Sequence, residues 1–296
     1  MAGEELDMSK PWNKDHYGFT DAELVSYPLV FKPDLLKGEV ALVSGAGQGI
    51  GKGIAAAFAR CGADLVICGR TQEKLDAARS FLEQFGGRVM THALNIRDPD
   101  QVEGLMDRTW AEFGRCDHLI NNAGGQFPIP SMDIPDKGWR AVIDNNLNGT
   151  WYMMQRAARR WRDHGQPGSI VNIIIVLSRG QPQVAHTCAS RAGVVYLSKS
   201  LAVEWAPHNI RVNCVAPGAV ESSGFATYPE AGRKSFYTCA PMQRVGNVFD
   251  IAEACIYYSS HSGNFVTGET IDISGGSALW GEMWPAGKPD YFKNAG

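Results

Sequence analysis

A glycine-rich turn lies near the start of the chain, between a short apolar run and a helical pattern. The run Val40–Val43 predicts a buried strand, and apolar residues with helical spacing follow the turn. Glycine lets the chain bend sharply and lets a pyrophosphate approach the backbone, where the free N–H groups of the new helix bind phosphate. This order of elements predicts a dinucleotide site, with contacts from Gly45, Gln48, Gly49, Ile50 and Gly51.

Strand and helix signals alternate along the chain, as is typical of a parallel sheet covered on both faces. We expect strands at Val40–Val43, Asp64–Cys68, Arg88–His92, His118–Asn121, Ser169–Val176, Arg211–Ala216 and Glu269–Ile273. We expect helices near Gly49–Arg60, Gln72–Phe85, Pro99–Phe113, Asn148–Trp161, Cys188–Trp205 and Phe249–Ser260. The predicted fold class is therefore α/β, a Rossmann-type doubly wound parallel sheet in a single domain, with its ligand at the carboxyl ends of the strands.

Three segments fall outside this alternation. The expected divisions are an N-terminal extension at 1–36, a dinucleotide-binding domain at 37–276, a substrate cover within it at 219–245, and a C-terminal tail at 277–296. The cover mixes glycine, serine and aromatic residues, which suits a mobile segment over a substrate. The tail carries Trp280 and Trp284, which we expect to dock at a subunit interface, roof the site or pack within one subunit.

Further motifs follow the glycine-rich turn in a fixed order. The spacing Gly-x-x-x-Gly-x-Gly, then Asn121-Asn122-Ala123-Gly124 and Pro217-Gly218, resembles the short-chain dehydrogenase/reductase family over Leu36–Gly276. Blocks at 121–127, 169–174, His186 with 191–194, and 199–202 are similar to those of its peroxisomal trans-2-enoyl-CoA reductase-type members. The resemblance implies a nicotinamide-dependent oxidoreductase with cofactor contacts from Asn122, Ala123, Gly124, Pro217, Gly218 and Val220.

The residues after the second expected strand bear on the choice of cofactor. Arg70 and Thr71 stand there, without the acidic residue that usually binds the ribose 2′-hydroxyl of NAD. A cation and a hydroxyl favour a 2′-phosphate and hence NADP(H), although Arg70 is otherwise a solvated charge at a helix start. By resemblance, Asn95 with the neighbouring Ile96 contacts the adenine. Ser222 either contacts the nicotinamide amide or is a loop hydroxyl bonded to its own backbone.

In the family that this chain resembles, a Tyr and a Lys four residues apart on one helix act with a Ser and an Asn. The Asn is present as Asn146, where it would support a water relay. Alignment on the Arg-Ala-Gly block places Arg191 at the Lys position and Thr187 at the Tyr position. Ile174-Ile175 covers the Ser position, with Ser178 the nearest hydroxyl, so three of the four roles are altered.

These replacements leave the proton donor open. Arg191 can hold ribose hydroxyls, but its very high pKa excludes it as a proton donor, and Thr187 is far less acidic than a phenol. His186 titrates near neutrality and is either a donor or a local hydrogen-bonding group. Farther along the helix, core packing is expected for Tyr196, and a solvated or structural role for Lys199.

An activated carbon–carbon double bond is the substrate that best tolerates loss of the Tyr. Hydride addition to the β-carbon of an unsaturated thioester gives an enolate, whose oxygen needs support from Thr187, Ser178, the Gln126 amide or backbone N–H groups. The sequence therefore predicts an NADPH-dependent reductase of an enoyl-CoA or enone-like small molecule. The alternatives are a carbonyl reductase with a displaced acid such as His186, and a non-catalytic NADP(H)-binding protein.

Composition bounds the remaining classes. A net charge of −3 with mixed signs gives no basic surface for nucleic acid or an anionic membrane, and no apolar run approaches membrane-spanning length. The seven cysteines form no C-x-x-C cluster, so we expect no metal site and a reducing compartment. Neither the acidic N-terminus nor Lys293–Gly296 resembles a targeting signal, so we expect a cytoplasmic protein. The family resemblance implies a homotetramer or homodimer.

Overall fold

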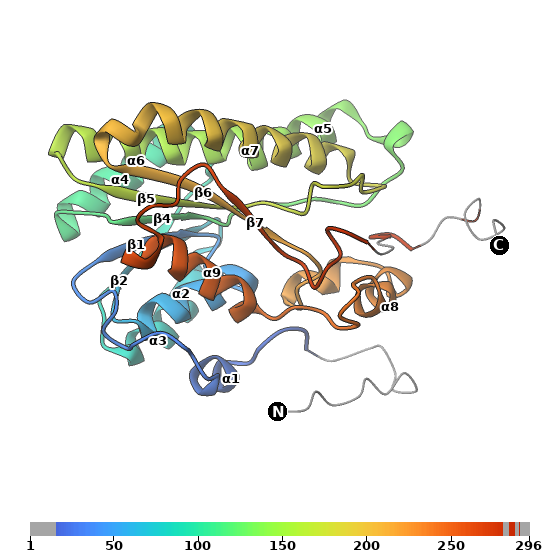
Figure 1. Ribbon diagram of the computed structural model, residues 1–296, viewed down its shortest axis with the longest axis horizontal. Coiled ribbons are helices and arrows are strands. Elements are labelled where there is room, and N and C mark those ends of the chain that lie inside the picture. The colour runs from blue at the N-terminus through green and yellow to red at the C-terminus, as the bar shows by residue number, and fades with distance from the viewer. Residues whose placement is uncertain (1–15, 281–283, 288–289, 291–296) are drawn as a thin grey trace.

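Seven parallel strands form one sheet in the order β3-β2-β1-β4-β5-β6-β7 (Figure 1). The computed structural model describes residues 16–280, 284–287 and 290. The strands are β1 (Val40–Ser44), β2 (Asp64–Gly69), β3 (Val89–Ala93), β4 (His118–Asn121), β5 (Gly168–Ile173), β6 (Ile210–Pro217) and β7 (Thr270–Ile273). The chain crosses from one side of β1 to the other before β4, so the switch in strand order lies between β1 and β4.

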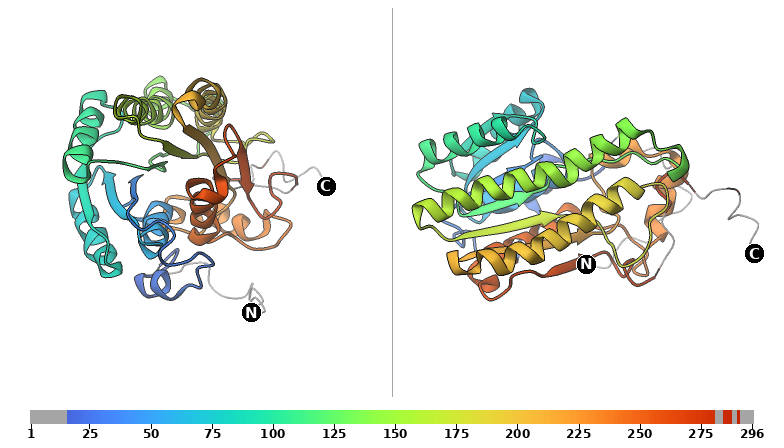
Figure 2. Two further views of the ribbon diagram at one scale, coloured as in Figure 1. Left: turned by 60° about the vertical axis from the view of Figure 1, so that its left-hand side comes forward. Right: turned by 90° about the horizontal axis from the view of Figure 1, so that it is seen from above.

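Helices cover both faces of this sheet, as the end-on view in Figure 2 shows. They are α1 (Asp21–Ser26), α2 (Gly49–Arg60), α3 (Gln72–Leu82), α4 (Pro99–Phe113), α5 (Asp136–Ile143), α6 (Gly149–His164), α7 (Ala185–Trp205), α8 (Glu230–Thr238) and α9 (Val248–Ser259). Helices α2, α3 and α9 pack on one face, and α4, α6 and α7 pack on the other. Helix α8 lies beyond the carboxyl ends of the strands.

Burial on both faces explains why the strands are almost continuous apolar runs. Every residue of β1 and of β5 is buried. Phe58 and Phe249 fill one helix layer, and Trp161 fills the other, where its indole N–H donates to the Cys116 carbonyl oxygen at 2.6 Å. The predicted fold class, a doubly wound parallel sheet, is confirmed.

The boundaries of several elements differ from the predictions. Strand β5 ends at Ile173 rather than Val176, although the Ile174 amide still bonds the Val215 carbonyl before the chain turns away. Helix α7 begins three residues earlier than expected, at Ala185. Helices α5 and α8 were not predicted, because proline and glycine interrupt the apolar pattern in both segments.

The described part of the N-terminal extension lies along α2 and α9. Tyr27 stacks on Phe249 with ring centroids 4.3 Å apart, and Arg60 donates to the carbonyl oxygens of Leu24 and Tyr27. Lys52 of α2 pairs with Asp21 at 2.5 Å. These contacts give residues 16–36 no core of their own, so they form a strap on the domain.

The tail after β7 runs back over the loop that follows β5. Ser178 donates to the Ala278 carbonyl oxygen at 2.5 Å, and the Ala286 amide donates to Gln183 Oε1 at 2.9 Å. Trp284 is half-buried, whereas the Trp280 side chain is 70% exposed. Packing within the chain therefore accounts for Trp284 but not for Trp280.

Two glycines of α4 isolate the effect of backbone conformation on stability. Neither Gly104, in the helix interior, nor Gly114, at its C-cap with φ 71°, has any atom within 4 Å of an added Cβ. We expect Gly104→Ala to raise the free energy of unfolding by about 0.5–1 kcal/mol through helix propensity. Gly114→Ala should lower it by about 1 kcal/mol because φ is positive. Urea unfolding measures both, and shifts of the same sign would contradict this account.

Candidate functional site

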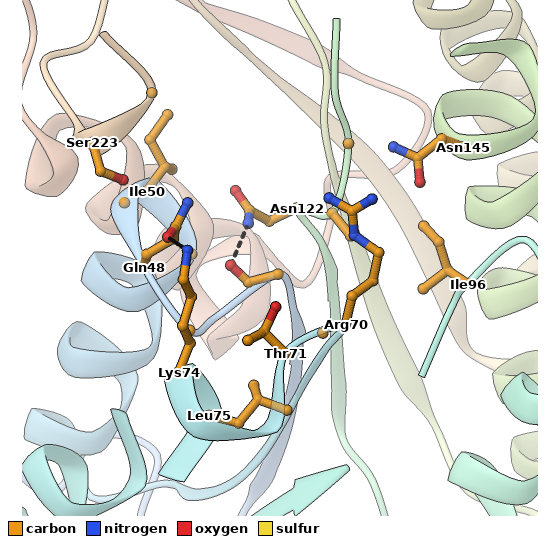
Figure 3. A pocket seen from close by; sticks show the side chains of 18 of the residues that line it. Gln48, Ile50, Arg70, Thr71, Lys74, Leu75, Ile96, Asn122, Asn145 and Ser223 are labelled. Atoms are coloured by element: carbon orange, nitrogen blue, oxygen red, sulfur yellow. Dashed lines mark hydrogen bonds between the residues drawn. The ribbon is translucent and has the colours of Figure 1, made fainter. Parts of the chain in front are cut away.

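A cradle for a dinucleotide opens at the switch point of the sheet (Figure 3). Gly45 and Gly49 have φ of 69° and 58°, and a Cβ on Gly51 would collide with the Gly45 carbonyl oxygen. Gln48, the N-cap residue of α2, makes no side-chain cap bond, which leaves the first N–H groups of the helix for an anion. Asn122 donates to the Ser44 carbonyl oxygen at 3.0 Å and supports the turn.

The cradle is a cavity of about 330 Å³. Its lining includes most of the predicted cofactor residues: Gly45, Gln48, Gly49, Ile50, Gly51, Arg70, Thr71, Asn95, Ile96, Asn122, Ala123, Gly124 and Ser222. It does not include four predicted residues: Arg191, which is buried against Gly124, and Pro217, Gly218 and Val220, which build the base of the cover. The Gly218 amide donates to the Ile273 carbonyl oxygen, and Val220 forms a bridge with Gly246.

Lys74 is a cationic lining residue that the sequence reasoning missed. It lies in the first turn of α3, four positions after Arg70, so a second cation close to Arg70 in the sequence was the available signal. Its ammonium donates to Gln48 Oε1 at 2.5 Å, and the Arg70 side chain projects into the same cradle (Figure 3). No carboxylate belongs to the lining that the described residues form. The cradle is therefore positively charged near the carboxyl end of β2.

Each residue of the loop after β4 contacts a side chain from another element. A Cβ on Gly124 would collide with Nη2 of Arg191 on α7. Gly125 makes two backbone hydrogen bonds to Asn146, each 3.0 Å long. Gln126 donates to the Tyr228 hydroxyl oxygen at 2.6 Å, and the Phe127 ring packs edge-on against His186 at 4.6 Å. We call residues 124–127 the active-site loop.

Asn146 lies in a π-helical turn, Asp144–Asn148, between α5 and α6. Such turns are rare and often occur at functional sites. Asn146 Oδ1 accepts from the Gly125 amide, and Nδ2 donates to the Gly125 carbonyl oxygen. The side chain thus clamps the active-site loop, a role that the sequence did not reveal, in addition to the water relay predicted for it.

The Arg191 side chain is buried, and its Nε and Nη1 find no hydrogen-bond partner among the described residues. Burial lowers the pKa of Arg191 to about 10, so the guanidinium still carries its charge at neutral pH. An unpaired buried charge costs several kcal/mol. The guanidinium therefore has N–H donors that no acceptor among the described residues satisfies.

His186 and Thr187 are both buried at the start of α7. The Thr187 amide donates to His186 Nδ1 at 2.8 Å, which places the ring proton on Nε2. Burial lowers the pKa of His186, and the carbonyl groups of Val184 and Phe127 act in the opposite direction. The imidazole is therefore neutral at pH 7 and a weak acid.

The structure also places the hydroxyl-bearing residues Ser178 and Tyr196. The Ser178 hydroxyl bonds the Ala278 carbonyl and fastens the tail. Tyr196 is 75% exposed, so the prediction that it packs in the core is wrong. It shares an exposed face of α7 with Ala189, Ala192 and Val203. Helical periodicity alone does not show which face of this helix is exposed. The homotetramer or homodimer stays a prediction.

Residues 45–278 match a family profile described as Enoyl-(Acyl carrier protein) reductase. A short chain dehydrogenase from Bacillus anthracis has a similar structure, with a TM-score of 0.75 and 36% identity, covering 84% of this chain and 100% of that one. The chain belongs to the short-chain dehydrogenase/reductase family. The citronellol catabolism dehydrogenase of Pseudomonas aeruginosa is also similar, with a TM-score of 0.76, 34% identity and coverage of 86% and 100%.

Curated relatives of this short-chain dehydrogenase/reductase are oxidoreductases by name. A peroxisomal 2,4-dienoyl-CoA reductase of Danio rerio is 36% identical, over 88% of each chain. A 3-oxoacyl-[acyl-carrier-protein] reductase of Thermotoga maritima is 34% identical, over 82% of this chain and 99% of that one. The prediction of an oxidoreductase in this family is thus confirmed. In the part of the chain that the structure describes, no helix has the length and apolarity needed to cross a membrane.

The contact between Gly124 and Arg191 can be tested with two neighbouring glycines. We expect Gly124→Ala to displace the guanidinium and lower kcat/KM by roughly 10- to 100-fold. Gly125→Ala is the control, because the nearest atom to its added carbon is Asn145 Nδ2 at 3.6 Å. Equal effects of the two substitutions on kcat/KM would contradict the role given to Arg191.

Proposed function

We propose that this protein reduces an activated carbon–carbon double bond of an acyl-CoA thioester with NADPH. The observation that carries the proposal is the buried, unpaired guanidinium of Arg191, with Thr187 one turn before it on α7. That pair replaces the lysine and tyrosine expected in the family, and neither replacement is an acid suited to protonating an alkoxide. A thioester enolate needs no such acid, because water can protonate its α-carbon.

Relatives support the same substrate class. Proteins named 2,4-dienoyl-CoA reductase, from Danio rerio to Bacillus subtilis, align over four-fifths or more of this chain. The relative named 3-oxoacyl reductase supports the alternative of carbonyl reduction. The neutral His186 argues against that alternative, because the displaced acid that it requires is the imidazolium.

The choice of NADPH rests on the two cations beside the second strand. Arg70 and Lys74 line the cradle, where the ribose of the adenosine half would lie next to the residues that follow β2. A 2′-phosphate would pair with both, whereas the lining that the described residues form has no carboxylate to accept a hydrogen bond from a 2′-hydroxyl. When bound, the nicotinamide supplies the hydride.

The side chains then have separable tasks. The N–H groups at the start of α2 bind the pyrophosphate, and Arg191 holds ribose hydroxyls or a substrate oxygen beside the active-site loop. Asn146 fixes the loop through Gly125. The cover at 219–245 closes over the bound acyl group and excludes water from the hydride path.

A substrate panel tests the proposed reaction. NADPH oxidation is measured with a 2-enoyl-CoA, a 2,4-dienoyl-CoA and a 3-oxoacyl-CoA of the same chain length. We expect turnover with at least one unsaturated thioester and a kcat/KM at least about 100-fold lower with the 3-oxoacyl thioester, since neither Thr187 nor Arg191 is an acid suited to protonating the alkoxide. Turnover of the 3-oxoacyl thioester alone, or of none, would refute the proposal.

The two cations give a separate prediction about the cofactor. We expect Arg70→Ala and Lys74→Ala each to raise the KM for NADPH by on the order of 10- to 100-fold, the effect of losing one charge-assisted hydrogen bond. The KM for NADH should change little. Lys199→Ala, on an exposed part of α7, is the control. Parallel losses with both cofactors would argue against 2′-phosphate recognition.

A further inference from the structure

Tyr228 brings a phenol from the cover to the active-site loop. It follows the 3₁₀ turn Ser223–Thr227 and precedes α8. Its ring packs edge-on against Phe236 at 5.1 Å, within a small aromatic cluster of the cover. Its hydroxyl extends from that cluster to Gln126, which is 102 positions away in the sequence.

The direction of this hydrogen bond decides what the phenol can do. The Gln126 amide nitrogen has only protons to offer, so Nε2 donates and the Tyr228 oxygen accepts, at 2.6 Å. The phenolic O–H has no acceptor among the described residues. Burial raises the pKa of Tyr228, with the bond from Gln126 acting in the opposite direction, so the hydroxyl keeps its proton across the physiological range. A protonated O–H donor thus stands beside the active-site loop.

The other side-chain hydroxyls and the Asn146 amide around this loop are already engaged, whereas Nε and Nη1 of Arg191 and Nε2 of His186 have no partner among the described residues. Both ends of the Asn146 amide bond Gly125. The Ser178 hydroxyl bonds the tail, and the Thr187 hydroxyl lies 3.3 Å from His186 Nδ1, an acceptor that it shares with the Thr187 amide. Tyr228 is the side-chain hydroxyl that remains available there in the described structure.

We infer that Tyr228 donates the hydrogen bond that stabilises the thioester oxygen during reduction, and that Gln126 is its positioning residue. The inference rests on the proposed function. The β-carbon accepts the hydride, the electron pair of the double bond moves through the α-carbon onto the thioester oxygen, and the α-carbon then takes a proton from water. The nicotinamide loses two electrons and the acyl chain gains them. Tyr228 keeps its own proton throughout, as a donor to a developing oxyanion does.

The first test removes only the hydroxyl. Tyr228→Phe keeps the ring against Phe236, and we expect kcat with the enoyl-CoA to fall by roughly 10²- to 10³-fold, the usual effect of losing one oxyanion donor. The KM for NADPH should stay unchanged. Tyr237→Phe is the matched control, because its hydroxyl lies in the same aromatic cluster but donates to Glu221 at 2.6 Å. Its kcat should stay close to that of wild type, because its hydroxyl bonds Glu221 and not the active-site loop.

The second test reverses the hydrogen bond without removing it. In Gln126→Glu the carboxylate accepts a hydrogen bond from the phenolic O–H of Tyr228, which turns this donor away from the substrate. We expect a loss in kcat as large as that of Tyr228→Phe, and no further loss when the two are combined. Gln126→Met removes the partner without diverting the hydroxyl and should cost less than Gln126→Glu.

The outcomes distinguish a failure of the role given to Tyr228 from a failure of the proposed function. Wild-type kcat in Tyr228→Phe, or in Gln126→Glu, overturns the role of Tyr228 while leaving NADPH-dependent reduction of the thioester standing. Absence of turnover by the wild-type protein with every unsaturated thioester overturns the proposed function and this inference with it. A loss confined to Tyr228→Phe and Gln126→Glu, with normal NADPH binding and unchanged melting temperatures, supports it.

Discussion

The charge of Arg191 is the constraint on which the site depends. The side chain projects from α7 into the interior beside Gly124, where Nε and Nη1 lack partners among the described residues. Such an arrangement costs several kcal/mol unless acceptors arrive from outside the chain. Lysine at the same place would offer a point charge, whereas the planar guanidinium offers several directed donors. Arginine therefore suits a position that must grip more than one oxygen, and its high pKa confines it to binding and orientation.

Contacts from several elements fix the position of the active-site loop beside Arg191. Its four residues meet α7, the π-helical turn, the cover and the start of α7 again, so elements distant in the sequence fix one short stretch of backbone. Glycine at 124 makes room for the guanidinium, and the amide of Asn146 satisfies both backbone groups of Gly125. Because each contact holds a different residue, the loop cannot shift at one point without disturbing its neighbours. This rigidity is what a site for hydride transfer requires.

The cradle could be predicted because the residues that form its turn are close together in the sequence. The other features of the site depend on contacts between residues that are distant in the sequence. Gly45 follows β1, and Gly49 and Gly51 lie in the first turn of α2, so the residues that indicate the turn lie close together in the sequence. Tyr196 was misplaced because periodicity shows that a helix has faces without showing which one meets the sheet. The clamp formed by Asn146 depends on a π-helical turn that no residue pattern in the sequence predicts. Tyr228 depends on how the cover folds back, which the sequence does not encode locally.

The cover has a packing arrangement that allows it to act as a unit. Phe225, Phe236 and Tyr237 form a small core apart from the main helix layers, and Tyr17 of the N-terminal strap packs against it. The Gly18 amide donates to Glu221, and a Cβ at Gly18 would press on the Ser222 backbone, so the strap sits against the base of the cover. The bond between Gln126 and Tyr228 joins this small core to the active-site loop, so the position of the loop and that of residues 219–245 depend on each other.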